Sequence, residues 1–310
     1  MAAGIATAAT RASAQDSPEA PPESPPPAFV PPPPGYEPPT QYAQASTPAA
    51  APASAEIAPT FLTLDRMDGT TRFGIQMGWD KIDDTSISDG FVMRYELYGQ
   101  YLFPNKVVGV YGQLPISHAF NFNGNDATGM GNIEMGGFFL PTHSSELILR
   151  GGLAMSTASD SNNNEILSNV YSTYERLTDL MLIAPQYTTL RLSASTLQQR
   201  DTLFFRADLG FDLAIDKPDG ATTSVWFRGN VALGVRATGV DITAELINIA
   251  AVNGGGDNAS LSDRFFHTLG FSLRSQGENQ FHLGTVFPLD RDARGEIWII
   301  SVGYQRAVSL

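Results

Sequence analysis

Charged residues recur at alternate positions within otherwise apolar stretches of this 310-residue chain. Arg94 and Glu96 are separated by one residue, as are Arg206 and Asp208, and mainly apolar side chains lie between and around them. A period of two is that of a β-strand, whose successive side chains point to opposite faces. Each stretch therefore predicts a strand with one apolar face and one charged face.

The charges nearest the middle of these strands are the candidate functional residues. If the strands close into a barrel with its apolar face outward, the charged side chains line the lumen and form a constriction that orients a small polar or anionic solute. The alternative is that they pair with one another and fill the lumen, because buried charges must be compensated. The candidate constriction residues are Arg94, Glu96, Glu134, Arg150, Arg206, Asp208 and Arg228. The full set of charges expected in the lumen adds Arg72, Arg191, Arg236, Arg274, Asp80, Glu146, Asp212 and Glu245, and the two signs nearly balance.

Catalysis would most naturally use a histidine. The chain has His118, His143, His267 and His282, of which only His118 has an adjacent serine, Ser117. Adjacency in sequence does not create the geometry of a nucleophile and its base. We therefore expect no enzyme, no catalytic residue, no cofactor and no metal site, with a hydrolase that uses one of these histidines as the alternative.

Composition excludes several classes of function. Cysteine is absent, so neither disulfides nor thiolate metal sites can form. The formal net charge of −13 argues against a nucleic-acid partner, which favours basic surfaces. No run of apolar residues approaches the roughly 18 that a transmembrane helix requires.

The elements that position the charges are predicted from the alternation alone. The connections alternate in length along the chain, which is typical of a membrane barrel with short turns at one end and is not expected of a soluble sandwich. We predict an all-β, transmembrane, up-and-down antiparallel barrel of about 12 strands. The connection 157–188 is the longest, and apolar residues at helical spacing within 165–184 predict a short helix in the barrel mouth or on its rim. The predicted strands are 72–80, 90–103, 106–117, 129–140, 146–156, 189–197, 202–215, 224–236, 241–251, 264–274, 280–289 and 295–310.

The last strand carries a family resemblance. Trp298, Ile300, Val302 and Tyr304 alternate with small or polar residues from Ser301 onward, which resembles the closing strand of Gram-negative outer-membrane β-barrel proteins. In that family the strand typically ends in an aromatic residue read by the barrel-assembly machinery, whereas this chain ends in Leu310. The segment 129–133, Gly-Met-Gly-Asn-Ile, is similar to a segment of porin-like barrels associated with aromatic-degradation pathways.

The resemblance implies an outer-membrane location, with membrane lipid and the assembly machinery as partners and both termini in the periplasm. Residues 1–14 are then a possible truncated signal segment, because Ala12-Ser13-Ala14 has the form of a cleavage site. Residues 15–60 are Pro- and Ala-rich and predict a disordered periplasmic linker, and 61–310 form the barrel.

Two functions follow as expectations. The first is a channel for passive or facilitated passage of small solutes. The second is a closed structural or interaction barrel that displays extracellular loops and is tethered to the cell envelope, including the cell wall, by its Pro-rich arm.

Overall fold

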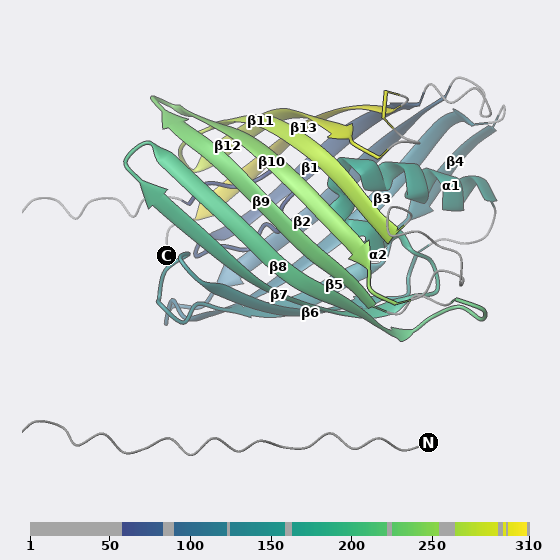
Figure 1. The fold of residues 1–310 in the computed structure, drawn as a ribbon. Coiled ribbons are helices and arrows are strands. Elements are labelled where there is room, and N and C mark those ends of the chain that lie inside the picture. The colour runs from purple at the N-terminus through teal and green to yellow at the C-terminus, as the bar shows by residue number, and fades with distance from the viewer. Residues whose placement is uncertain are drawn as a thin grey trace, which may run out of the picture. The chain divides into compact units, whose positions relative to one another are not determined.

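The wall of the barrel is built from antiparallel strands that are tilted relative to its axis (Figure 1). The computed structural model describes residues 58–82, 90–122, 125–158, 163–221, 225–253, 264–290, 294–295 and 297–308. The predictions for residues 1–57, a signal segment and most of the linker, lie outside the described residues. The strands are β1 (Thr71–Ile82), β2 (Gly90–Leu102), β3 (Val108–Phe122), β4 (Asn125–Met130), β5 (Ile133–Phe139), β6 (Ile148–Met155), β7 (Thr188–Arg200), β8 (Leu203–Asp216), β9 (Val225–Ala237), β10 (Val240–Ala251), β11 (Phe265–Ser275), β12 (Asn279–Pro288) and β13 (Ile297–Val308).

The barrel is closed and has twelve wall strands, as predicted. Each strand pairs antiparallel with the next along the chain, except that β4 and β5 both pair with β3. The pairings of β1 with β13, and of β2 with both β1 and β3, close the sheet into a ring. β4 and β5 share one position in the wall, because both pair with β3, β4 with its second half and β5 with its first.

The break between β4 and β5 connects the wall to a segment inside the barrel. The Gly131 N–H donates to the carbonyl of Pro115 across the wall (2.9 Å), whereas the Asn132 N–H turns inward to the carbonyl of Leu182 (2.5 Å). The sequence predicted one unbroken strand over 129–140. The structure corrects this, because Asn132 leaves the ladder and its backbone and side-chain N–H groups satisfy carbonyls of the segment inside the barrel.

The hairpin of β3 and β4 also differs from expectation. The sequence predicts a connection over 118–128 with a polar loop at 121–126, but pairing continues to Ala119↔Ala127 and Phe122↔Asn125. A ladder uses backbone groups, so polar side chains do not prevent it. Elsewhere the two-residue turns 201–202 and 238–239 fall at one end, called here the short-turn end, and the longest connection, 156–187, lies at the other.

The outer face of the wall is apolar and the inner face is polar. Leu209, Leu233, Trp298 and Ile300 are each more than half exposed, while the residues that alternate with them are mostly buried. This arrangement is the inverse of a soluble sandwich and is that of a barrel surrounded by lipid. Within the described residues, no helix is long and apolar enough to cross a bilayer.

A charge placed on the outer wall tests this membrane placement. Leu209 lies near the middle of β8 and is 58% exposed, and Ile215 lies on the same face at the strand end and is 65% exposed. Arginine costs about 2–4 kcal/mol at the bilayer midplane and about 0–1 kcal/mol near the interface. Denaturant unfolding from liposomes should therefore show a much larger loss of stability for Leu209→Arg than for Ile215→Arg. Equal losses would contradict the membrane placement.

Candidate functional site

The seven predicted constriction residues all lie on the inner face of the wall and are at most 5% exposed. Of the wider set expected in the lumen, Glu146 is an exception. It is exposed in the turn before β6, which begins only at Ile148. Asp241, at the start of β10, is fully buried and pairs with Arg274 and Arg236 (3.1 Å for the second). The charged inner face is therefore close to the one predicted.

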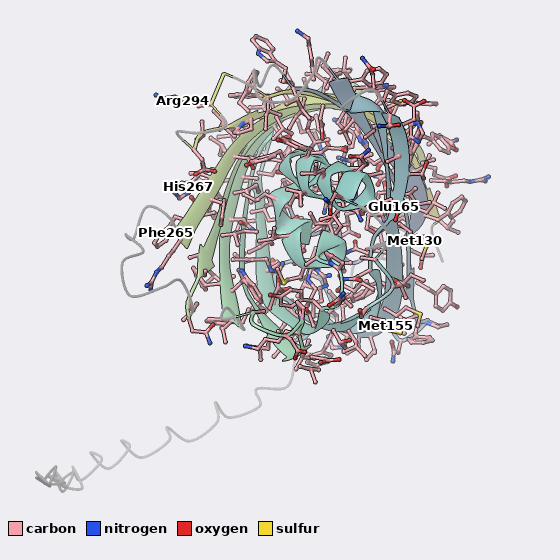
Figure 2. All side chains as sticks on the ribbon, turned by 90° about the vertical axis from the view of Figure 1, so that its right-hand side faces the viewer. Met130, Met155, Glu165, Phe265, His267 and Arg294 are labelled. Carbon is pink, nitrogen blue, oxygen red and sulfur yellow. The ribbon has the colours of Figure 1, made fainter. Side chains whose placement is uncertain are left out.

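Two segments that are not part of the wall fill this lumen. Figure 2, a view turned by 90° from Figure 1, shows the helical segment inside the ring of strands. The helical segment comprises α1 (Asn163–Ser172), η1 (Thr173–Asp179) and α2 (Leu180–Ile183). The plug segment comprises residues 58–70, most of which are buried.

The plug segment is re-entrant. Thr60 Oγ1 accepts hydrogen bonds from Arg274 (2.5 Å) and Gln305 (2.8 Å), both toward the short-turn end of their strands. Gly69 returns to that end, where its N–H donates to Ser145 Oγ (2.9 Å). The predicted linker boundary at residue 60 thus falls within a segment already inside the barrel, because Thr60 is itself buried there.

Glu245 of β10 holds the plug segment by its backbone. Its carboxylate accepts the N–H groups of Leu62 (2.7 Å), Thr63 (2.7 Å) and Leu64 (3.2 Å), and also the hydroxyl of Thr63 (2.7 Å). Glu245 is 1% exposed. Hydrogen bonds to a buried carboxylate are stronger than those between neutral groups. This single wall side chain therefore satisfies three consecutive N–H groups that would otherwise be orphaned.

Asp65 holds the plug segment by its charge. Its carboxylate pairs with Arg150 (2.5 Å) and Arg228 (3.2 Å) and accepts a hydrogen bond from Ser193 (3.0 Å). Burial alone would raise the pKa of Asp65, but the positive charges of Arg150, Arg228 and Arg191 prevail and lower it well below the usual aspartate value. Asp65 is therefore ionised, and protonation under strongly acidic conditions would remove its contribution.

The helical segment is attached to the wall partly through its polar face. Ser168, Asn169 and Ser172 of α1 are buried, whereas Val170 is 45% exposed. Ser117 of β3 bonds to both Ser168 (2.8 Å) and Asn169 (2.7 Å). The structure thus places the predicted helix inside the barrel. α1 meets the wall both with these polar residues and with Leu167 and Tyr171, which pack against a small apolar cluster of Ile82, Val92 and Ala119.

Arg176 joins the helical segment to the plug segment near the middle of the lumen. Its guanidinium donates to the carbonyls of Leu62 (2.5 Å) and Leu64 (2.9 Å) and pairs with Asp179 (2.8 Å). The hydroxyl of Thr178 donates to the Thr63 carbonyl between them (2.7 Å). The two segments therefore form one connected unit inside the barrel.

A buried apolar cluster also contributes to this unit. Phe61 and Leu64 of the plug segment pack with Leu177 and Met181 of the helical segment, together with wall residues that include Trp226. Complete burial of each large apolar side chain contributes about 1.5–3 kcal/mol. The closed lumen therefore has a packed interior as well as an ionic one.

Glu175 of η1 packs against Gly78 of the wall, a position with no room for a larger side chain. Its carboxylate accepts hydrogen bonds from Gln76 (2.7 Å) and Ser301 (2.7 Å), and a Cβ on Gly78 would overlap it. Burial raises the pKa of Glu175 despite the opposing influence of Arg94 and of the two hydrogen bonds. Both carboxylate oxygens of Asp80, a nearby acidic residue, lack a hydrogen-bond partner.

The raised pKa of Glu175 predicts a pH dependence of the closed state. Glu175 binds its proton more tightly in the folded protein than in the unfolded chain. The stability of the folded protein is therefore greatest below the ordinary glutamate pKa and falls as pH rises through the raised pKa. Glu175→Gln retains an acceptor for Gln76 and Ser301 and carries no charge. Its thermal unfolding midpoint should exceed that of the wild type at neutral pH, and the two midpoints should converge in acid. A lower midpoint for the variant at neutral pH would contradict this.

The four histidines lie apart, and the described hydrogen bonds of their rings are with hydroxyl and amide groups. His118 bonds to Thr128 (2.6 Å), His267 bonds to Asn248 (2.8 Å), and His143 lies exposed in a turn. His282 faces the lumen, where its Nε2 lacks a hydrogen-bond partner. Among the described residues, no group of three or more His, Cys, Asp or Glu side chains is arranged to hold a metal ion.

Sequence reasoning missed the charged residues of the two lumen segments, chiefly Asp65, Arg66, Asp68, Glu175, Arg176 and Asp179. All six are at most 4% exposed. They lie outside any strand, so the two-residue period that identified the wall charges did not apply to them. One pattern pointed to them: Asp65, Arg66 and Asp68 cluster just before the first predicted strand.

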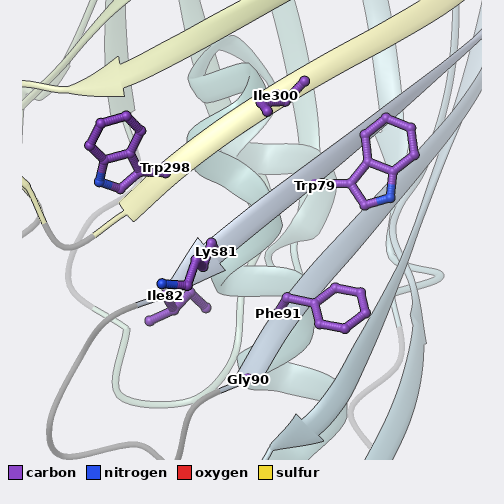
Figure 3. Close-up of a pocket in the computed structure, with 7 residues that line it drawn as sticks. All are labelled: Trp79, Lys81, Ile82, Gly90, Phe91, Trp298 and Ile300. Atoms are coloured by element: carbon purple, nitrogen blue, oxygen red, sulfur yellow. The ribbon is translucent and has the colours of Figure 1, made fainter.

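The outer wall carries an apolar groove at the end opposite the short turns. It has a volume of about 620 Å³ and is lined by Trp79, Phe91, Trp298 and Ile300, with Lys81 beside them (Figure 3). Aromatic and basic side chains at this level are typical of the interface between a barrel and its membrane. The groove therefore belongs to the lipid-facing surface and not to the lumen.

Comparisons with known proteins agree with this architecture. No family model matches the sequence, and no curated protein matches it significantly. An outer membrane channel from Pseudomonas putida F1 has 11% identity and a TM-score of 0.52, over 84% of this chain and 100% of that one. The KdgM porin in complex with disordered oligogalacturonate has 10% identity and a TM-score of 0.45, over 77% of this chain and 99% of that one. The CymD monoaromatic hydrocarbon channel has 9% identity and a TM-score of 0.41, over 79% of this chain and 90% of that one. The chain therefore has the fold of outer-membrane β-barrel channels.

Proposed function

We propose that the protein is an outer-membrane channel for small solutes that is closed at rest and conducts when the plug segment leaves the lumen. The observation that supports this most directly is that the plug segment is not part of the wall and is held largely by polar groups. Glu245, Asp65 and Arg176 supply most of these contacts. Water can replace polar contacts of this kind, and the inner wall then remains charged and able to hydrate a pathway.

The order of the segments in the sequence fits this proposal. Residues 1–57 precede the plug segment, which enters and leaves the lumen at the short-turn end. If that end faces the periplasm, as in barrels with short periplasmic turns, tension on the arm or its binding to an envelope component would draw the plug segment out. Membrane lipid and the assembly machinery remain the partners proposed for the wall.

A disulfide between the plug segment and the wall tests the proposal. A Cβ on Gly270 would lie 3.4 Å from Thr63 Cγ2, close enough for a Thr63→Cys/Gly270→Cys pair to be bridged, and the chain has no other cysteine. In planar bilayers, the oxidised double variant should not conduct, and reduction should restore the openings of the wild type. Equal conductance in both states would refute the proposal.

A second disulfide provides the control. Thr243 and Ser272 are directly opposite each other on β10 and β11, and their hydroxyl oxygens lie 2.5 Å apart. The oxidised Thr243→Cys/Ser272→Cys variant carries a disulfide between two wall strands. Neither lumen segment is crosslinked. The conductance of this variant should not change on reduction.

A closed barrel that anchors the Pro-rich arm is the second candidate. It is favoured by the apolar cluster, which joins the plug segment, the helical segment and the wall into one packed interior. Absence of conductance from the wild type, and from every variant that weakens the plug segment, would support this function over the channel.

A further inference from the structure

The site that holds Asp65 contains one positive charge more than the wall can neutralise. Arg150, Arg191 and Arg228 contribute three guanidinium groups, all at most 5% exposed. Two wall carboxylates lie among them. Glu134 pairs with Arg150 and with Arg191 (2.5 Å), and Asp212 pairs with Arg191 (3.2 Å) and Arg228 (3.0 Å). Asp65 of the plug segment supplies the third negative charge. Asp179 of the helical segment also lies 3.7 Å from Arg191, but it pairs more closely with Arg94 and Arg176 (2.8 Å each), which its charge compensates first.

We propose that Asp65 occupies a built-in binding site for a small organic monocarboxylate, and that the solute of this channel carries such a group and competes with Asp65. This rests on the proposed function in one respect, because the site becomes accessible only when the plug segment moves. The competition would couple arrival of the solute to release of the plug.

The geometry of the site selects a carboxylate. Arg150 reaches Oδ1 of Asp65 (2.5 Å), and Nη1 of Arg228 lies between Oδ1 (3.3 Å) and Oδ2 (3.2 Å), so both oxygens are recognised by planar donors. The hydroxyl of Ser193 adds a third donor at 3.0 Å. A cation is repelled by the three arginines. A dianion would exceed the single positive charge available and be repelled by Glu134 and Asp212.

A second plug carboxylate serves as the comparison. Asp68 pairs with a single arginine, Arg72, and also accepts hydrogen bonds from the amide of Gln100 (3.0 Å) and from the Thr70 N–H (2.9 Å). Arg206 likewise pairs with Asp208 two residues along its own strand (2.8 Å) and needs no plug carboxylate. Among the described ion pairs, the convergence of two arginines on one plug carboxylate occurs at Asp65.

Chemical rescue of the full-length chain tests the proposal. Asp65→Ala removes the carboxylate and leaves a space that formate or acetate can occupy. Titration with sodium formate, against sodium chloride at equal ionic strength, should raise the thermal unfolding midpoint of this variant in a saturable manner and increase its refolding yield. Two control variants should show only the effect of chloride. In Asp65→Asn the amide fills the space, and in Asp68→Ala the vacated site has one arginine and not two.

Bilayer recordings provide the second measurement. Asp65→Asn keeps the shape of the plug segment but loses its charge, so it should open more often than the wild type and pass anions several-fold better than cations, as judged by the reversal potential in a salt gradient. In the open state the plug segment has left the site vacant, so formate bound there should reduce the chloride current through the open channel.

The outcomes separate the two proposals. The carboxylate site is overturned if formate changes neither the stability nor the refolding yield of Asp65→Ala, or if it stabilises Asp68→Ala equally. This holds even if the variants conduct. Formate that stabilises Asp65→Ala specifically supports the site, and the absence of conductance in every variant then refutes only the channel.

Discussion

Replacement of Glu245 by alanine is expected to open the lumen. The wild-type carboxylate accepts four hydrogen bonds from the plug segment, and all of these groups are buried. A hydrogen bond to a charged group contributes about 1.5–3 kcal/mol, and alanine leaves three N–H groups without an acceptor. Because such terms are not additive, we expect a loss of about 3 kcal/mol, which corresponds to a roughly 100-fold increase in the ratio of open to closed channels.

Single-channel recording of Glu245→Ala would measure this ratio directly. Glu134→Ala is the matched control, because Glu134 is also a fully buried wall glutamate but bonds to wall residues alone, among them Tyr111, Gln113 and Arg150. It should reduce barrel stability with a much smaller effect on opening. Equal opening in both variants would show that Glu245 does not act through the plug segment.

Replacement of Arg176 by methionine is expected to separate the two lumen segments. The guanidinium is 1% exposed and donates to two plug carbonyls while it pairs with Asp179. Removal of one partner of a buried ion pair costs about 3–5 kcal/mol. Methionine keeps most of the side-chain volume, so the cost arises from the lost polar contacts and not from a cavity. Asp179 would retain Arg94 as a partner (2.8 Å).

Limited proteolysis and thermal unfolding would measure the effect of Arg176→Met. Both lumen segments should become accessible to protease at a lower temperature than in the wild type, while the wall resists. Arg236→Met is the control, since Arg236 pairs with Asp241 within the wall (3.1 Å). Protection of both segments to the same temperature in Arg176→Met and the wild type would exclude a linking role for this arginine.

The wall was largely predictable because its pattern is local. Arg94 and Glu96 lie inward and Leu97 outward since neighbouring strand residues point to opposite faces, and this rule requires no knowledge of the partner strand. The same rule failed at Glu146, where the strand had not yet begun, and at residues 118–128, where backbone pairing continued through polar residues.

The lumen was not predictable because its contacts join residues far apart in the chain. Asp65 and Arg228 are 163 residues apart, and Leu62 and Glu245 are 183 apart. No short-range period connects them. The sequence left open whether the wall charges form a constriction or pair with one another. In the structure many of them pair, and several do so with a plug segment whose own charges, Asp65, Arg66 and Asp68, lie before the first predicted strand.

The sequence by itself determined that this chain forms a barrel with an apolar exterior and a nearly charge-balanced inner wall, because alternation of side chains along a strand is a property of the strand alone. Tertiary structure decided that the lumen is filled, and by which residues. Closing the barrel brings Arg150, Arg191 and Arg228 together with one positive charge in excess of their wall partners, and burial of that charge requires an anion from elsewhere. In the closed state the anion is Asp65.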